Sequence, residues 1–187
     1  VPEFNFITIS GVGSPADEIF GDKIGTLYSL AYTIKMAAKR MTTPPEGHFD
    51  FTVYPLEGVW DLNEEAKSRF TGKVDKNDLV YQLMIRQPGF VDKKLFHEML
   101  ELAKEKKKNP LLDQVRFEMI SEGLCVQMLH QGRFEDEPVT FEQMEAFAGD
   151  ECLDRRSKVH REIYLSDARK VVPEKLKTVL RFQVCSV

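Results

Sequence analysis

Three polar side chains capable of acid–base chemistry stand close together near the C-terminal end of the sequence. The segment VHREIYL, residues 159–165, places His160, Glu162 and Tyr164 at alternate positions. Because alternate residues of a strand face the same side, we expect these three to share one face, with Ile163 on the other, under the helices. A carboxylate shielded by aromatic rings can balance the charge of a lipophilic cation. With a raised pKa, it can instead act as a general base on water.

Aromatic and sulfur-containing side chains are the second component of the predicted site. Alternation along the neighbouring predicted strands places Tyr54 and Met84 on the side of Glu162, and Trp60 and Phe90 lie near the ends of those strands. Flat rings and a polarizable thioether suit a large planar ligand. Each residue also has a packing interpretation: Glu162 as a solvated carboxylate, the tyrosines as cross-strand partners, and Trp60 as a loop anchor.

The other chemistry-bearing residues form no recognisable metal or phosphate motif. His130 and His160 have no further ligand at metal-binding spacing. Gly11-Val12-Gly13 closes a predicted strand but lacks the lysine or third glycine of a phosphate loop. We therefore expect neither a metal ion nor an organic cofactor.

The elements that carry these residues occur twice in the same order, strand, helix, strand, strand. This order predicts an α+β fold of duplicated units, joined edge to edge into a curved antiparallel sheet. We expect helices on one face, a ligand cleft at the junction on the other, and a single domain over residues 1–187 with pseudo-repeats at about 1–90 and 115–187. The predicted strands are 4–12, 49–56, 79–86, 115–120, 124–130, 159–165 and 178–184, and the helices of the two units are 25–40 and 141–147.

Composition narrows the class of protein. With 26 basic against 30 acidic residues among 187, the formal net charge is −4, which argues against a protein that neutralises nucleic-acid phosphates. The three cysteines are widely spaced and odd in number, so no disulfide framework is indicated. The sequence has no apolar run of about 18 residues and no signal-peptide pattern. We expect a cytoplasmic monomer or homodimer, with no nucleic-acid or membrane partner.

Five runs of sequence resemble the GyrI-like, small-molecule-binding family, in its stand-alone branch. They are ISGVGSP, LYSLAYTIK, VYPLEGVWD, YQLMIRQPGFV and HREIYLSDARKVVPEKLKTVLR, and together they extend over nearly the whole chain. The resemblance implies a duplicated fold with an aromatic cleft in which a glutamate contacts the ligand. Some stand-alone members of this family are hydrolases that open the cyclopropane ring of DNA-alkylating natural products of the duocarmycin and yatakemycin type.

By this resemblance, the cleft glutamate is Glu162, with Tyr164 assisting and Trp60 as the aromatic wall. Glu57 of the PLEG turn is a rival carboxylate. The function predicted is a detoxifying hydrolase for flat, hydrophobic cyclopropane electrophiles, with Tyr54, Met84, Phe90 and His160 contacting the ligand. Two other hypotheses remain: a non-catalytic protein that sequesters lipophilic or cationic drugs, and an interaction module that modulates a DNA topoisomerase.

Overall fold

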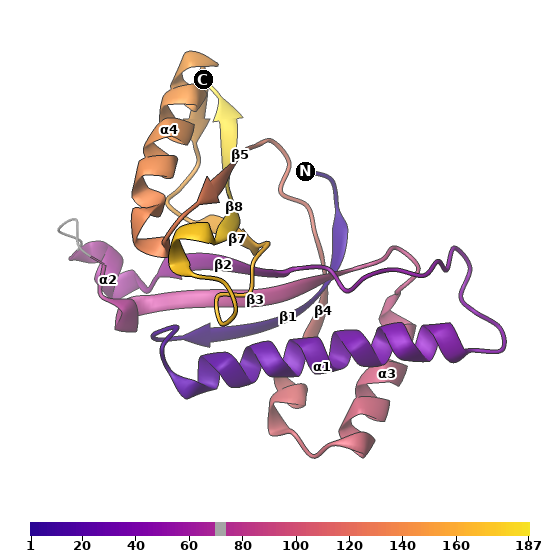
Figure 1. The fold of residues 1–187 in the computed structure, drawn as a ribbon. Helices are drawn as coiled ribbons and strands as arrows, with labels where there is room; N and C mark the ends of the chain where they lie inside the picture. Colours follow the sequence, from indigo (N-terminus) through magenta and orange to yellow (C-terminus); the bar gives the residue numbers. More distant parts are fainter. Residues whose placement is uncertain (70–73) are drawn as a thin grey trace.

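The first half of the chain builds one strand–helix–strand–strand unit (Figure 1). Branched and aromatic residues fill its first strand, whereas the apolar residues of its long helix recur every three or four positions, as at Leu27, Leu30 and Ile34. This spacing gives the helix one apolar stripe that packs on the strands. The computed structural model describes residues 1–69 and 74–187. The elements of this unit are β1 (Phe4–Val12), α1 (Glu18–Arg40), β2 (Leu56–Leu62), the short helix α2 (Glu64–Ser68) and β3 (Leu79–Gln87).

A helix and a strand then complete this half of the sheet. The helix α3 (Lys93–Lys106) begins where the Asp92 side chain accepts a hydrogen bond from the backbone N–H of Leu95 at 2.8 Å. This bond satisfies one of the amide groups that every helix start leaves unpaired. The apolar stripe of α3 packs beside α1 in the same core. The strand β4 (Arg116–Ile120) pairs antiparallel with β1 at one edge of the sheet.

The second half repeats the order strand, helix, strand, strand, which confirms the predicted duplication. A short strand is added between its helix and its second strand. The assignment of a single domain to residues 1–187, with pseudo-repeats at about 1–90 and 115–187, stays a prediction. The elements of this half are β5 (Cys125–Gln131), α4 (Glu137–Asp150), β6 (Leu153–Arg155), β7 (His160–Tyr164) and β8 (Lys177–Ser186).

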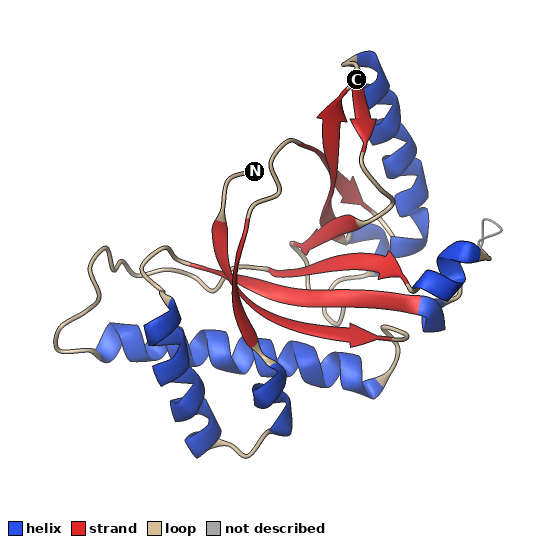
Figure 2. Ribbon diagram, turned by 180° about the vertical axis from the view of Figure 1, so that it is seen from behind, coloured by secondary structure: helices blue, strands red, loops and turns tan. Residues whose placement is uncertain are grey.

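The eight described strands form one antiparallel, curved sheet that does not close on itself (Figures 1 and 2). Seven strands run in the order β4-β1-β3-β2-β7-β8-β5, and β6 pairs with the C-terminal end of β8. The two repeats meet where β2 pairs with β7. Here Gly58 lies opposite Glu162, and Trp60 lies opposite His160. The junction therefore falls within the sheet rather than at an edge.

One face of the sheet, here called the helix face, carries both halves of the core. In the first half α1 and α3 pack over Ile7, Leu83 and Ile85, and in the second α4 packs over Leu180 and Phe182. Pairing through β1, β3, β2, β7 and β8 places these strand residues on the same side of the sheet. The alternate strand residues form the opposite face. The predicted placement of helices on one face is thus confirmed.

The strand predicted at residues 49–56 is wrong. β2 begins only at Leu56, directly after Pro55. This strand pairs on both sides, and proline has no backbone N–H to donate to a ladder, so the strand starts after it. Trp60 is consequently a strand residue, only 6% exposed, rather than a loop anchor. Helices α1 and α4 also begin earlier than their apolar periodicity indicated, at Glu18 and Glu137.

Candidate functional site

The junction of the two repeats brings Trp60 and Tyr164 together on the helix face. The indole N–H of Trp60 donates a hydrogen bond to Tyr164 Oη at 2.9 Å. Gly58 lies beside this bond: a Cβ there would stand 2.8 Å from Trp60 Nε1 and 3.1 Å from Tyr164 Oη. The bond therefore depends on the missing side chain at Gly58.

The prediction that His160, Glu162 and Tyr164 face away from the helices is wrong. Glu162 pairs with Gly58 on one side and with Leu180 on the other, and both of these lie on the helix face. The three residues do share a face, as the alternation predicts. Their strand has a charged residue on each face, so alternation alone does not indicate which face meets the helices.

Glu162 is buried and held by a neighbouring imidazole. Its carboxylate is 8% exposed, and His160 Nε2 lies 3.1 Å from Glu162 Oε1. The other ring nitrogen of His160 lies 3.3 Å from the backbone oxygen of Lys158. The ring also meets Phe141 of α4 edge-on, with the centroids 4.9 Å apart. These contacts fix the His160 ring, whose Nε2 lies within hydrogen-bond distance of the Glu162 carboxyl group.

A second buried carboxyl group, Glu137, faces Glu162 from the first turn of α4. Glu137 is 7% exposed, and its Oε1 has no hydrogen-bond partner. Burial, then the negative charges of Glu162 and Glu135, raise the pKa of Glu137 to about 9. At neutral pH Glu137 is therefore a protonated acid. Glu137 lies outside the helix predicted at residues 141–147, and nothing in the sequence around it indicates a buried side chain.

Tyr164 is a second proton-bearing group beside Glu162. Burial first, and the neighbouring Glu162 charge second, raise the pKa of Tyr164 well above its usual value. The phenol therefore stays protonated at neutral pH. Because its oxygen accepts the Trp60 N–H bond, its own proton is free to point elsewhere. Tyr164 is thus a hydrogen-bond donor for Glu162 or for a bound molecule.

Aromatic rings from both repeats surround these polar groups. The Trp60 ring lies 5.4 Å from Tyr81 and 5.8 Å from Phe20 of α1, between ring centroids. Phe134, in the turn before α4, meets the Tyr164 ring edge-on at 6.1 Å. Phe20 and Phe134 were also missed by the sequence analysis, since each stands at the start of a helix rather than on a strand. Both repeats thus contribute rings to this group. We call the rings of Phe20, Trp60, Tyr81, Phe134 and Tyr164 the aromatic lining.

The structure does not bring Met84 into this group. Met84 pairs with Glu57 and Thr8 on the opposite face, where it is fully buried, and its sulfur accepts a hydrogen bond from Arg161 at 2.9 Å. The placement of Met84 beside Glu162 is therefore wrong. Alternation within β3 correctly predicted that Met84 faces away from Leu83 and Ile85. The wrong step was to assign Glu162 of β7 to the same face as Met84.

Tyr54 and Phe90 belong to a different aromatic cluster. Tyr54 stacks on Phe51 with the ring centroids 6.3 Å apart, and Phe90 meets Phe51 edge-on at 5.9 Å. Arg86 also lies over the Tyr54 ring, 5.1 Å from its centroid. The predicted strand 49–56, which placed Tyr54 on the side of Glu162, does not form at Tyr54, so that placement is wrong. Of the seven predicted site residues, four therefore lie together: Trp60, His160, Glu162 and Tyr164.

Glu57, the rival carboxylate, lies on the opposite face of the sheet from Glu162. Arg161 donates a hydrogen bond to Glu57 Oε2 at 2.7 Å, and both side chains are buried. Burial raises the pKa of the Glu57 carboxyl, although the Arg161 guanidinium opposes this shift. Glu57 thus forms an ion pair with Arg161 on the opposite face of the sheet from the aromatic rings around Trp60 and Tyr164.

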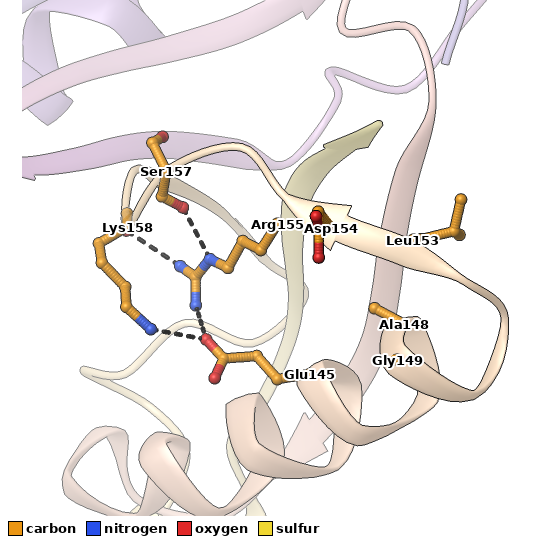
Figure 3. Close-up of a pocket in the computed structure, with 8 residues that line it drawn as sticks. All are labelled: Glu145, Ala148, Gly149, Leu153, Asp154, Arg155, Ser157 and Lys158. Carbon is orange, nitrogen blue, oxygen red and sulfur yellow. Dashed lines mark hydrogen bonds and ion pairs between the residues drawn. The ribbon is translucent and has the colours of Figure 1, made fainter. Parts of the chain in front are cut away.

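Two surface depressions lie away from this group. The first, about 310 Å³, lies between α4 and β6, where Arg155 and Lys158 both bind Glu145 (Figure 3). All the Arg155 donor nitrogens have partners there. The second, about 290 Å³, is lined by residues of β1, β3 and β4. Within residues 1–69 and 74–187, no group of three or more His, Cys, Asp or Glu is arranged to hold a metal ion.

The sequence fits a known family over almost its whole length. Residues 1–184 match the model of the GyrI-like small molecule binding domain. The chain belongs to the GyrI-like family. The resemblance predicted from PLEGVW and HREIYL is thereby confirmed. Among the described helices of this GyrI-like chain, none combines the length and apolar character of a membrane span.

Solved structures of other proteins share the GyrI-like fold of this chain. A crystallised hydrolase from Listeria innocua is 37% identical over 99% of this chain and 89% of its own, with a TM-score of 0.86. A further Listeria innocua hydrolase structure is 39% identical at the same coverage and TM-score. The C-terminal domain of EcmrR is 14% identical over 100% of this chain and 94% of its own, with a TM-score of 0.54, which shows the fold alone. No curated protein matches the sequence.

Proposed function

We propose that the protein is a cytoplasmic detoxifying hydrolase that adds water to the cyclopropane ring of flat, hydrophobic, DNA-alkylating natural products. Membership of a small-molecule-binding family and similarity to two Listeria innocua hydrolases support a hydrolase of small molecules. The observation that carries the proposal is the buried Glu162 carboxylate, which stands with a protonated Glu137 and Tyr164 beside aromatic rings.

The substrate is already close to reacting, because its strained ring is conjugated to a carbonyl group. The enzyme mainly needs to hold it flat, to place a water molecule at the cyclopropyl carbon and to stabilise the charge that develops on the carbonyl oxygen. The rings of Trp60, Phe20 and Phe134 suit the first task, since they offer flat apolar surfaces from both repeats.

Glu162 is the general base in this mechanism. It takes a proton from water as the water oxygen bonds to the cyclopropyl carbon, while His160 holds the carboxylate in position. The carbon–carbon bond of the cyclopropane breaks, and its electron pair moves into the conjugated ring, which becomes aromatic. The former carbonyl oxygen then carries the negative charge.

A protonated group next to Glu162 completes the reaction. Glu137 or Tyr164 donates a proton to the developing phenolate oxygen, and burial keeps each of them protonated at neutral pH. The products are a ring-opened alcohol and a phenol, with one water consumed. Proton exchange with solvent returns Glu162 and the donor to their starting states. The environments of Glu162 and Glu137 thus give two carboxyl groups different roles.

Product counting tests this proposal. The purified protein is incubated with a tenfold excess of a duocarmycin-type cyclopropane alkylator in ¹⁸O-labelled water, and the products are followed by mass spectrometry. We expect several equivalents of ring-opened product with ¹⁸O on the opened carbon, and a large loss of rate in Glu162→Gln. The exposed Glu142→Gln is the matched control. One equivalent or less of product, or an unchanged rate in Glu162→Gln, contradicts the proposal.

A second candidate function is non-catalytic sequestration of lipophilic cations. The observation that favours it is a buried carboxylate among aromatic rings, because both attract a positive charge. Binding of the cationic dye rhodamine 6G, followed by fluorescence polarisation, then weakens sharply in Glu162→Gln. Equal affinity for neutral planar dyes, or turnover in the assay above, counts against this candidate.

A further inference from the structure

A network of buried charges lies on the opposite face of the sheet, behind the candidate site. Arg161, only 3% exposed, donates to Glu57 at 2.7 Å and, through Nε, to Glu122 at 2.9 Å. Arg181 donates to the other oxygen of Glu122 at 2.6 Å. We call Glu57, Glu122, Arg161 and Arg181 the Arg161 network. Its two positive and two negative side chains pair with one another, so the burial of charge is compensated within the network.

The Arg161 network joins parts of both repeats. Glu57 belongs to β2 of the first repeat, whereas Arg161 and Arg181 belong to β7 and β8 of the second. Glu122 lies between β4, the last strand of the first half of the sheet, and β5, the first strand of the second half. The backbone oxygen of Glu122 also accepts a hydrogen bond from Gln183 of β8 at 3.0 Å. The network therefore ties the junction of β2 and β7 to the segment that links the two halves.

Each central member of the network is the chain neighbour of a site residue. Arg161 precedes Glu162, and Glu57 precedes Gly58, which pairs with Glu162 across the junction. Since neighbouring strand residues point to opposite faces, a slip of β7 by one residue would exchange Arg161 with Glu162. Such a slip would leave buried charges without partners, which is strongly unfavourable. The network thus selects the register that places Glu162 on the helix face.

We infer that the Arg161 network positions the candidate site, by holding the β2–β7 junction in the register that aims Glu162 at the substrate and Trp60 at Tyr164. The residues of the network touch no substrate, so they are positioning residues. This inference rests on the proposed function for its kinetic consequences, but the geometry of Trp60 tests it independently.

The experiment compares Arg161→Met, Arg161→Lys and Glu122→Gln with the control Arg86→Met. Arg86 lies on β3 on the same face as the network, where it packs over the Phe4 ring. The measurements are kcat and KM for opening of a duocarmycin-type cyclopropane, the Kd of the ring-opened product, and thermal stability. The emission maximum of Trp60, the sole tryptophan of the chain, is recorded as well.

We expect Arg161→Met to lower kcat by about a hundredfold, the size typical of a small misplacement of a reacting group. Its Kd for the ring-opened product changes by less than about threefold, since the aromatic lining remains. Arg161→Lys recovers part of kcat, and Glu122→Gln, which keeps a hydrogen-bonding amide, lowers kcat by about tenfold. The emission maximum of Trp60 moves to longer wavelength in Arg161→Met but not in the control Arg86→Met.

A kcat of Arg161→Met close to that of Arg86→Met, in a folded protein, overturns the inference. The inference is also overturned if kcat and the affinity for the ring-opened product fall equally, in parallel with thermal stability. That pattern indicates a general loss of structure. If Arg161→Met does not fold, Glu122→Gln decides by the same criteria. Absence of turnover in the wild-type protein defeats the proposed function instead. The positioning role then depends on Trp60 emission, and an unchanged maximum in Arg161→Met and Glu122→Gln rejects it.

Discussion

Replacing Glu137 by glutamine changes how the stability of the fold depends on pH. The folded-state pKa of Glu137 is about 9, against an ordinary value of 4.5. Because the folded pKa is raised, the folded state binds the proton more tightly than the unfolded state. The stability linked to that proton is complete below about pH 4.5 and is lost as the pH rises towards 9.

The size of the effect follows from this difference in pKa. Each pH unit between the two values removes about 1.4 kcal/mol of unfolding free energy through this one group. Between pH 5.5 and 7.5 the wild-type protein therefore loses at most about 3 kcal/mol through Glu137. Glutamine is neutral at every pH and has nearly the same shape, so the Glu137→Gln variant avoids this loss.

Urea denaturation at pH 5.5, 6.5 and 7.5 measures the effect. We expect the variant to gain stability relative to the wild type at each step upward in pH. Glu142→Gln is the matched control, because Glu142 is also an acidic residue of α4 but its side chain is exposed. Its stability should follow the wild type. Parallel pH curves for the wild type and Glu137→Gln would refute a protonated, buried Glu137.

Three further substitutions test the geometry of the junction. Gly58→Ala should push the Trp60 indole away from Tyr164, with a loss of about 1–3 kcal/mol in urea denaturation and a red-shifted Trp60 emission; an unshifted emission rejects this contact. Tyr164→Phe should cost about 1–3 kcal/mol, because the buried Trp60 N–H loses its acceptor, and unchanged stability would mean that the bond is absent. Met84→Leu should alter ligand affinity little, measured by Trp60 quenching, because Met84 lies on the opposite face; a marked loss of affinity would place the ligand there instead.

The order of the elements could be predicted from the sequence because it depends on local periodicity, whereas the pairing of strands depends on partners distant in sequence, as between β4 and β1. The alternation in LVYQLMIR and the apolar spacing in the long helix each fix one element without knowledge of the rest. The start of β2 could have been predicted as well, since Pro55 cannot donate in a strand that pairs on both sides. A strand that starts after Pro55 contains Trp60, whereas a strand at residues 49–56 leaves Trp60 in a loop.

The composition of the site could be predicted only in part. Trp60, Glu162 and Tyr164 stood out by residue type, but period-two alternation divides a strand into two faces without saying which one meets the helices. That choice depends on partners distant in sequence, such as Glu57 and Glu122, which bind Arg161 on the opposite face. Glu137 could not be identified for a similar reason, because its high pKa comes from burial and from the charge of Glu162, which is distant in sequence.

A crystal structure of Glu162→Gln soaked with a duocarmycin-type cyclopropane tests the central claim most directly. The claim is that the ligand binds on the helix face, between the start of α1 and the start of α4. We predict that its cyclopropyl carbon faces residue 162, that its carbonyl oxygen lies within hydrogen-bond reach of Tyr164 or Glu137, and that its rings contact Trp60. A ligand bound on the opposite face, beside Glu57 and Met84, would contradict the claim.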